Sequence, residues 1–392
     1  MVKAPGVVTG RYGTIGQVFF VDQDFWPLNT ALYVRDFKSN DPKFISYLLK
    51  TLDFHAYSDK GAVPGVNRNH LHEALVRVPP LAEQRAIAHV LGTLDDKIEL
   101  NRQINQTLEH IAQAMFKSWF VDFEPVKAKV AAIAAGADQH GITRAAMRTL
   151  SGKTDAELDA LQIAQPEHYL ELKTTAEIFP DAMQGSELGK IPAGWALRPL
   201  PEFVDVNPTR QLKKGAIAPY LDMANVPTNS VRAQNIIERE FGSGSKFVNG
   251  DTLLARITPC LENGKTAFVD FLEAGQVAWG STEFIVLRPK QFLPSEFAYF
   301  LCRHPEFRDF AISHMSGTSG RQRVPNDCFQ NYIFALASHS ILDAFGRLTG
   351  KIMADIKALD MESRTLAILR DTLLPKLLSG ELDVSVLPAF ED

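Results

Sequence analysis

Two stretches of the chain carry mainly apolar residues at alternating spacings of four and three. Each position in the second stretch stands 254 residues after its counterpart in the first, so the two stretches keep the same phase. The first set is Ile87, Leu91, Leu94, Ile98, Asn101, Asn105, Leu108, Ala112, Met115 and Trp119, and the second is Ile341, Phe345, Leu348, Ile352, Asp355, Leu359, Glu362, Leu366, Leu369 and Leu373. A seven-residue repeat places one stripe of side chains along a long helix, ready to bury against a partner helix.

Either stripe alone is equally typical of an ordinary core helix. The shared phase favours two paired helices, because unrelated core helices have no reason to keep it. If the helices pack antiparallel about a pseudo-two-fold axis, Asn105 faces Asp355, and Asn101 lies opposite Leu359 and points toward solvent or a docked partner. The residues expected at this helix interface are Ile87, Leu91, Leu94, Ile98, Asn105, Ile341, Phe345, Leu348, Ile352 and Asp355.

Proline and glycine set the expected ends of both helices. The first follows Pro79-Pro80, ends before Pro125 and occupies 81–124. At 1.5 Å per residue, about 40 residues give a length of roughly 60 Å. The second occupies 336–379 and stops at Ser379-Gly380.

The segments ahead of the two helices also repeat. The stretch from Trp26 to Arg35 matches the stretch from Trp279 to Arg288 with its apolar positions kept, and both predict a strand with one buried face. We therefore predict an α+β fold with two mixed α/β modules, at 1–80 and 195–335, separated by two long antiparallel coiled-coil helices. A linker with short helices is expected at 125–194 and a tail at 380–392. The first module lacks a leading half, because only five residues precede Gly6, the counterpart of Gly250.

Composition limits the class of protein. The chain has 392 residues, 45% of them hydrophobic, which suits two or three globular domains. Its net charge of −5 argues weakly against a surface coated in basic residues, but local Lys and Arg clusters still allow nucleic-acid binding. The three cysteines fit neither a zinc site nor a disulfide framework, and no segment is apolar enough to span a membrane. A cytoplasmic protein without a metal site is expected.

No catalytic motif stands out. The glycine-rich stretch from Gly10 to Gly16 lacks the Gly-Lys-Ser/Thr ending of a phosphate loop, and Pro259 stands where the leading glycine before Gly264-Lys265-Thr266 belongs. Both stretches are better interpreted as hairpin turns, each presenting a basic residue. The tetrapeptides of amino-methyltransferases are also absent, so no catalytic residue is assigned.

Basic and amide side chains in loops are the remaining candidates for chemistry. Arg pairs bidentately with guanine, Asn or Gln pairs with adenine, and Lys binds phosphate. The alternative is that these are ordinary solvated loop charges; the stretch from Gly317 to Arg323, with two arginines and a glutamine, is the hardest to explain that way. The candidate DNA-binding residues are Arg11, Tyr12, Arg68, Asn69, Arg256, Lys265, Arg321, Gln322 and Arg323, with Lys60, Asn67 and Asn326 beside them.

Four motifs together resemble one known family. They are Pro79-Pro-Leu-Ala-Glu-Gln-Arg-Ala-Ile-Ala88, Leu94-Asp-Asp-Lys-Ile-Glu-Leu-Asn-Arg102, Phe116-Lys-Ser-Trp-Phe-Val-Asp-Phe123 and Leu373-Leu-Pro-Lys-Leu-Leu-Ser-Gly-Glu-Leu382. As a set they resemble the specificity subunit of type I restriction–modification enzymes. The resemblance covers almost the whole chain except about 127–175.

This resemblance implies a non-catalytic subunit with two target-recognition domains, each reading one half of a split double-stranded DNA sequence. Two modification (methyltransferase) subunits would dock on the helices and carry S-adenosylmethionine and the adenine methylation. Restriction/translocase subunits would add ATP- and Mg²⁺-dependent translocation and cutting, so this chain itself would hold no cofactor. The missing leading half departs from the family pattern and indicates a truncated, split or misassigned start.

Three functions follow as alternatives. The first is the DNA-recognition subunit of such a complex. The second is a truncated interaction scaffold that binds modification subunits without full DNA specificity, and methylation assayed with added modification subunits separates the two. The third, a self-contained enzyme, is disfavoured by the absent motifs.

Overall fold

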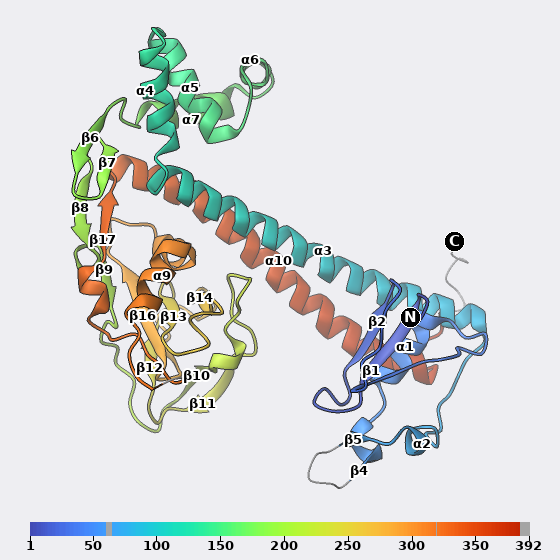
Figure 1. Ribbon diagram of the computed structural model, residues 1–392. Coiled ribbons are helices and arrows are strands. Elements are labelled where there is room, and N and C mark those ends of the chain that lie inside the picture. Colours follow the sequence, from blue (N-terminus) through green and yellow to red (C-terminus); the bar gives the residue numbers. More distant parts are fainter. Residues whose placement is uncertain (60–64, 319, 385–392) are drawn as a thin grey trace. The chain divides into compact units, whose positions relative to one another are not determined.

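The computed structural model has a mixed α and β fold, as expected, and describes residues 1–59, 65–318 and 320–384 (Figure 1). Its contacts divide into two compact units. Unit 1 consists of Met1–Gln103 and Leu359–Asp392, and unit 2 of Ile104–Ala358. Each long helix contributes one part to each unit, and each unit is described by itself below.

Unit 1 is built on a small antiparallel sheet in the order β2-β1-β3. Helix α1 contacts β1 and β2, and it begins at Pro42 because the Asp41 carboxylate caps the backbone N–H of Phe44. The elements before the first long helix are β1 (Gly6–Gly10), β2 (Val18–Val21), β3 (Ala31–Tyr33), α1 (Pro42–Lys50), a 3-10 turn η1 (Phe54–Tyr57), β4 (Ser58–Asp59), β5 (Gly65–Val66) and α2 (Arg68–Leu71).

Unit 2 contains two four-stranded sheets, β11-β10-β15-β12 and β14-β13-β16-β9, and the strand pair β17-β8. Its strands are β8 (Ala196–Pro199), β9 (Val204–Val206), β10 (Ile217–Leu221), β11 (Ile237–Glu240), β12 (Ser245–Phe247), β13 (Thr252–Ala255), β14 (Thr266–Phe268), β15 (Ala278–Gly280), β16 (Phe284–Pro289) and β17 (Ile333–Leu336). Its helices after β16 are α8 (Phe297–Arg303) and α9 (Pro305–Ser313), and three 3-10 turns are η2 (Leu200–Glu202), η3 (Met223–Asn225) and η4 (Cys328–Asn331).

The repeat found in the sequence is present in the strand register. In unit 1, Val8 on the central strand lies opposite Tyr33, and in unit 2 Leu253 lies opposite Val286, which is 253 residues after Tyr33. On the other side of the central strand, Val8 lies opposite Phe19 and Leu253 lies opposite Ala267. The sheet β2-β1-β3 is therefore the counterpart of β14-β13-β16.

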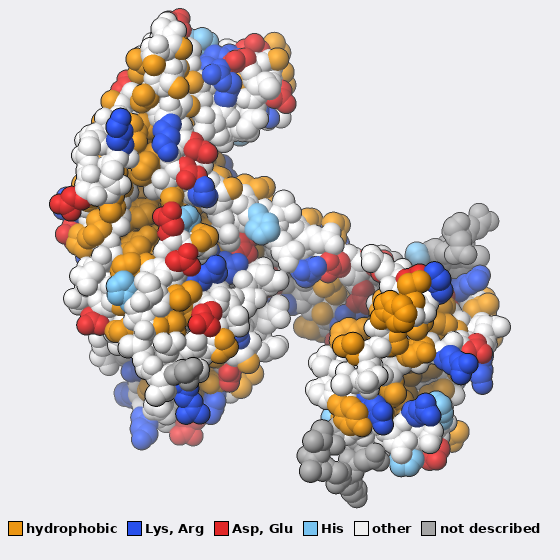
Figure 2. All heavy atoms as spheres, viewed as in Figure 1, with side chains coloured by type: hydrophobic (Ala, Val, Ile, Leu, Met, Phe, Trp, Pro, Cys, Tyr) orange, Lys and Arg blue, Asp and Glu red, His pale blue; other side chains and the backbone are white. Residues whose placement is uncertain are grey.

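The two modules differ on one face of this shared sheet. In unit 2, Val286 and Ala267 are buried in a core that also contains Leu221 and Phe247, residues of β10 and β12. The counterparts Tyr33 and Phe19 are exposed. The described part of unit 1 has no layer in this position, and Figure 2 shows hydrophobic side chains gathered over this region.

Trp26 shows the same difference most clearly. Its counterpart Trp279 is 5% exposed, packs against Tyr220 and Phe241 and lies under the guanidinium of Arg239, whereas Trp26 is 76% exposed. All three covering residues come from a segment, 217–241, that precedes the shared sheet of unit 2.

The two long helices are α3 (Leu81–Phe120) and α10 (His339–Ser379). In unit 1, Ile87 and Leu91 of α3 share a core with Leu374 and Leu378 of α10 and with α1. In unit 2, Ala112 and Phe116 of α3 share a core with Ile341 and Phe345 of α10. Within each unit, higher numbers on one helix therefore meet lower numbers on the other, so the helical segments pack antiparallel.

The polar positions of the stripes differ from expectation. Asn101 lies opposite Leu359 as expected, with its Nδ2 3.5 Å from that residue's backbone oxygen. It is fully buried rather than directed to solvent, however, and its Nδ2 donates to Glu362 at 2.7 Å. Asp355 is exposed, and Asn105 donates to the backbone oxygen of the next residue, Ile356, at 3.3 Å rather than to the Asp355 carboxylate. A strict seven-residue repeat drifts by about 20° per heptad around a straight helix, so the stripe alone does not fix which single side chain faces the partner helix.

The remaining interface residues follow the same drift. Leu348 and Ile352 are half-buried and pack against the unit 2 core, whereas Leu94 and Ile98 are half-buried outside the main cores. Thr349 and Ile356, which the stripe omits, are buried.

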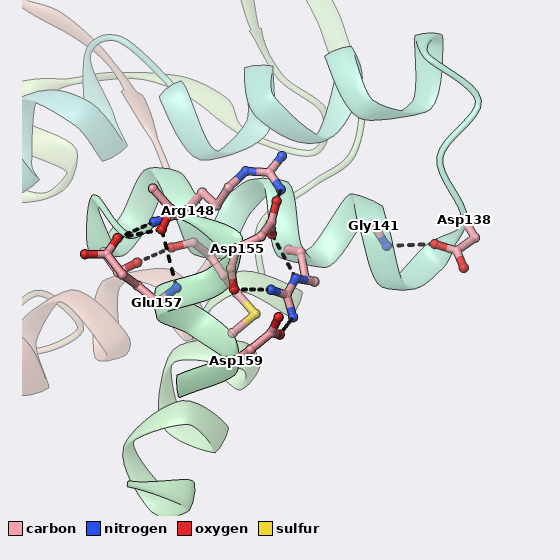
Figure 3. Close-up of polar contacts among 10 residues, drawn as sticks. Asp138, Gly141, Arg148, Asp155, Glu157 and Asp159 are labelled. Atoms are coloured by element: carbon pink, nitrogen blue, oxygen red, sulfur yellow. Dashed lines mark hydrogen bonds and ion pairs between the residues drawn. The ribbon is translucent and has the colours of Figure 1, made fainter. Parts of the chain in front are cut away.

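The segment 125–194, expected as a linker, has a small core of its own. Its helices are α4 (Glu124–Ala134), α5 (Gln139–Ser151), α6 (Asp155–Ala164) and α7 (Pro166–Glu177), followed by the hairpin β6 (Met183–Ser186) and β7 (Gly189–Pro192). Met147, Leu158 and Tyr169 meet in its core. Ion pairs from Arg144 and Arg148 to Asp155 join α5 to α6, and Figure 3 shows this cluster beside the Glu157 capping contact.

Fluorescence quenching tests the open face of unit 1. Of the four tryptophans only Trp26 is exposed, because Trp119, Trp195 and Trp279 are each 5% exposed or less. A neutral quencher such as acrylamide should therefore reach mainly Trp26, and Trp26→Phe should remove most of the quenchable emission. The unfolded chain gives the fully accessible reference. An unchanged quenchable fraction in the variant would show that this face is covered in solution.

Candidate nucleic-acid interface

In unit 1 the structure brings the four sequence-predicted residues together. Arg11 follows β1, and its backbone oxygen accepts a hydrogen bond from Val66, which directly precedes the turn that carries Arg68 and Asn69. The Arg11 guanidinium lies 5.1 Å from the centre of the Tyr12 ring. All four side chains are exposed. Lys60 lies outside the described residues.

The ring of Tyr12 leaves no room for a side chain at position 65, which is a glycine. It lies against the backbone of Gly65, where a Cβ atom would collide with the ring carbons. Tyr12 therefore helps to join the two loops as well as presenting an aromatic surface. Asn67 caps α2 through its Oδ1, which accepts from the backbone N–H of Asn69.

In unit 2, a cleft with a volume of about 350 Å³ holds three cationic side chains. They are Arg210, Lys246 and Arg256, from three segments distant in the sequence. The other lining residues are Asn207, Pro208, Thr209, Gly244, Ser245, Thr282, Phe284, Val286 and Asn326. Figure 2 shows Lys and Arg side chains at the end of the module that carries β10, β11 and β12. A concave, mainly polar surface with several cations is suited to a phosphate-rich ligand.

Buried Asp251 forms an ion pair with Arg210, one of the three cationic residues of the cleft. Its carboxylate lies 3.2 Å from Arg210 and 2.7 Å from Arg288. Burial raises the pKa of Asp251, although the hydrogen bond from Val248 and both arginines oppose that shift. We take the carboxylate as ionised, because two guanidinium groups and a backbone N–H surround it.

Arg256, expected to contact DNA, is held by the protein. Its NH1 donates to Asn326 Oδ1 at 2.8 Å, and its NH2 donates to the backbone oxygen of Val324. Its Nε is buried without a hydrogen-bond partner among the described residues. Arg256 therefore supports the cleft wall, with its bidentate edge already in use.

The two arginines of the stretch 317–323, Arg321 and Arg323, differ in their contacts. Arg323 forms a bidentate ion pair with Glu283, with contacts of 2.8–3.0 Å, and this pairing raises the pKa of Arg323. Gln322 is half-buried, and its backbone exchanges hydrogen bonds with Thr258. Arg321 is exposed, and its side chain makes no hydrogen bond or ion pair with the residues that the structure describes.

Lys265 lies at a second hollow in unit 2. Its ammonium donates to the backbone oxygen of Met223 at 2.7 Å, which closes the turn η3. The hollow is lined by Ala224, Asn225, Val226, Pro227, Thr228, Asn229, Ser230, Gln234 and Lys265. Amide and hydroxyl groups predominate, a set able to bond base edges or sugars.

The sequence analysis missed Asn207, Arg210 and Lys246. The comparison of the two modules offered no signal for them, because the stretch 195–249 has no counterpart in the first module. The dipeptide Asn207-Pro208 predicts a turn after a strand, and Asn207 does adopt a left-handed conformation, with φ of 52°. That signal alone does not distinguish a binding loop from any other turn.

The described part of the chain contains neither a candidate metal centre nor a candidate membrane span. Within residues 1–59, 65–318 and 320–384, no group of three His, Cys, Asp or Glu side chains is placed to hold a metal ion. Over the same part of the chain, no helix is both long and apolar enough to cross a membrane.

Comparisons with known proteins agree with the family resemblance. Residues 3–110 match the model of the type I restriction modification DNA specificity domain. The chain is 29% identical over 388 residues to the type I restriction enzyme HindI specificity subunit of Haemophilus influenzae, which covers 94% of this chain and 84% of that protein. It is 23% identical over 384 residues to the MjaIX specificity subunit of Methanocaldococcus jannaschii, covering 92% and 74%.

A solved structure is also similar. The S subunit of a type I restriction-modification system from M. genitalium matches 96% of this chain and 84% of its own, at 14% identity and a TM-score of 0.48.

Separate replacement of the two arginines tests their roles. Arg321→Ala should weaken DNA binding by the assembled complex, by about 1–3 kcal/mol if Arg321 reads a base edge, and leave the thermal midpoint unchanged. Arg323→Ala should instead lower the thermal midpoint, because it leaves the half-buried Glu283 without its partner. Equal loss of thermal stability in both variants, or unchanged DNA affinity in Arg321→Ala, would contradict this division.

Proposed function

The chain belongs to the specificity-subunit family of type I restriction–modification systems, and from this we propose that it recognises a bipartite double-stranded DNA sequence. Each of two target-recognition domains, 1–80 and 195–335, reads one half of the target. The segments 81–124 and 336–379, which contain α3 and α10, form the spacer. The carrying observation is the strand register shared by β2-β1-β3 and β14-β13-β16, which makes the two domains versions of one module.

The placement of basic side chains supports a role in DNA binding. In unit 1, Arg11 and Arg68 are exposed on adjoining loops. In unit 2, Lys213 and Lys214 are exposed on the loop that follows Arg210 of the cleft. Local clusters of this kind attract phosphates even in a chain of net charge −5.

The long helices supply surface for partner subunits. Both carry large apolar side chains that are 36–69% exposed. On α3 these are Leu81, Leu100, Ile104 and Ile111, and on α10 they are Met361, Ile368 and Leu369. We propose that two modification subunits dock on the helices and supply S-adenosylmethionine and the adenine methylation. Restriction subunits would add ATP-dependent cutting, and this chain would catalyse neither step.

A second function is favoured by one observation. In the described part of unit 1, the exposed face with Trp26, Phe19 and Tyr33 lacks the layer that completes the same face in unit 2. A domain in this state could leave one half-site unread. The chain would then act as a scaffold that binds modification subunits without full DNA specificity.

Methylome sequencing of host cells with and without this gene tests the proposal. Deletion should abolish adenine methylation at one bipartite sequence, and re-expression should restore it. Co-purification with a modification subunit but no sequence-specific methylation would support the scaffold instead. An unchanged methylome together with no bound modification subunit would contradict both functions.

A further inference from the structure

Asn326 presents a carboxamide whose two ends are not equivalent. It lines the cationic cleft of unit 2, and its side chain is exposed. The oxygen and nitrogen of an amide are usually hard to tell apart, but here the surrounding hydrogen bonds fix which is which.

A backbone N–H group fixes the orientation of the Asn207 side-chain amide. The N–H of Val286 can only donate, and it donates to Asn207 Oδ1 at 2.9 Å. Asn207 therefore turns its Nδ2 toward Asn326, where it donates to Oδ1 at 3.2 Å. The backbone N–H of Asn207 also donates to the Val286 oxygen at 2.7 Å, so Asn207 is held at three points.

The hydrogen bond from Arg256 independently identifies the same atom of Asn326 as the oxygen. A guanidinium has no acceptor, so the atom of Asn326 that its NH1 meets at 2.8 Å must be the oxygen. Both lone pairs of Asn326 Oδ1 are thus in use. Its Nδ2 is directed away from both partners, and no hydrogen bond from it to a described residue is present.

The left-handed backbone of Asn207 belongs to this arrangement. A non-glycine residue at a φ of 52° carries local strain, which persists only where the surroundings hold it. In this backbone conformation, the side chain of Asn207 orients the side-chain amide of Asn326. A side chain fixed in this way loses little conformational entropy on binding.

We propose that Asn326 is a specificity-determining residue that donates its Nδ2 hydrogens to an acceptor on a DNA base edge. This assignment rests on the proposed function, because it takes double-stranded DNA as the ligand of the cleft. Arg256 and Asn207 are positioning residues, and Lys246 supplies charge for the neighbouring phosphate.

The chemistry of the free end selects among bases. Guanine offers O6 and N7 and thymine offers O4 as major-groove acceptors, whereas cytosine offers only its N4 amino donor. The usual bidentate contact of asparagine with adenine requires a free amide oxygen, and Oδ1 of Asn326 has none to offer. Adenine N7 can accept one hydrogen bond, but it stands beside an N6 amino group that finds no free acceptor on Asn326, so Asn326 favours guanine or thymine at one position of the target.

Asn326→Asp tests this polarity. The substitution keeps the acceptor that Arg256 and Asn207 require and exchanges the free NH₂ for an oxygen. A carboxylate accepts from the amino group of cytosine or adenine, so the preferred base pair should invert, from G to C or from T to A, at one position. Asn326→Ala should relax the choice at that position by about tenfold or more. Asn263→Asp, the same change at an exposed residue outside the cleft, is the matched control.

The readout is the methylated sequence in cells that express each variant with its modification subunits. A single inverted or relaxed position in the variants, with the control unchanged, supports the assignment. The wild-type sequence in both variants, or loss of all methylation in Asn326→Ala with the complex still assembled, overturns it. If deletion of the whole chain leaves the methylome unchanged, the proposed function itself has failed, and that result is separate from either outcome above.

Discussion

The packing of aromatic side chains between α3, α8 and α10 is the interaction on which unit 2 depends. Phe116 of α3 lies 5.2 Å from Phe297 of α8 and 6.1 Å from Phe345 of α10, measured between ring centres. Rings at these separations in edge-on arrangements add to the free energy gained by burial alone. Because the three rings come from three elements, the strand-rich module, which continues into α8, cannot move on the helices without opening this core. In unit 1, Phe44 of α1 packs with Leu91 and Leu374, so an aromatic residue on a short helix has the same role.

The buried carboxylate of Glu109 on α3 adds direction to this packing. In unit 2, Glu109 accepts a hydrogen bond from Tyr299 at 2.6 Å and pairs with Arg303 at 3.2 Å. The burial of Tyr299 beside this carboxylate raises the pKa of its hydroxyl well above the usual value. Removal of one partner would strand a charge in an apolar core, and such losses are large. Apolar burial sets how strongly the module binds the helices, and these polar contacts select one orientation.

The sequence predicted the elements better than their contacts. The periodicity predicted helices at 81–124 and 336–379, and the structure has them at Leu81–Phe120 and His339–Ser379. Periodicity works here because it records which side of a helix is buried over many residues. It failed at Asp355 and Asn101, because a small rotation decides the direction of a single side chain. The contacts made by loop residues were less predictable from the sequence. Arg256 bonds to Asn326, 70 residues away in the sequence, and Arg323 pairs with Glu283, 40 residues away. Such pairs depend on the folded chain path, which local pattern does not contain.

Around Asn207, one residue shapes the loop and another presents its side chain to the cleft. Asn207 is bound to the backbone of β16 and shapes the loop, whereas Asn326 is exposed at the end of that arrangement. Replacement of Asn207 would disturb the loop, whereas a side chain at position 326 that keeps an acceptor for Arg256 and Asn207 would change only the chemical groups that the cleft presents. Under the role proposed for Asn326, one codon change would therefore alter which base the cleft selects while the fold stays intact.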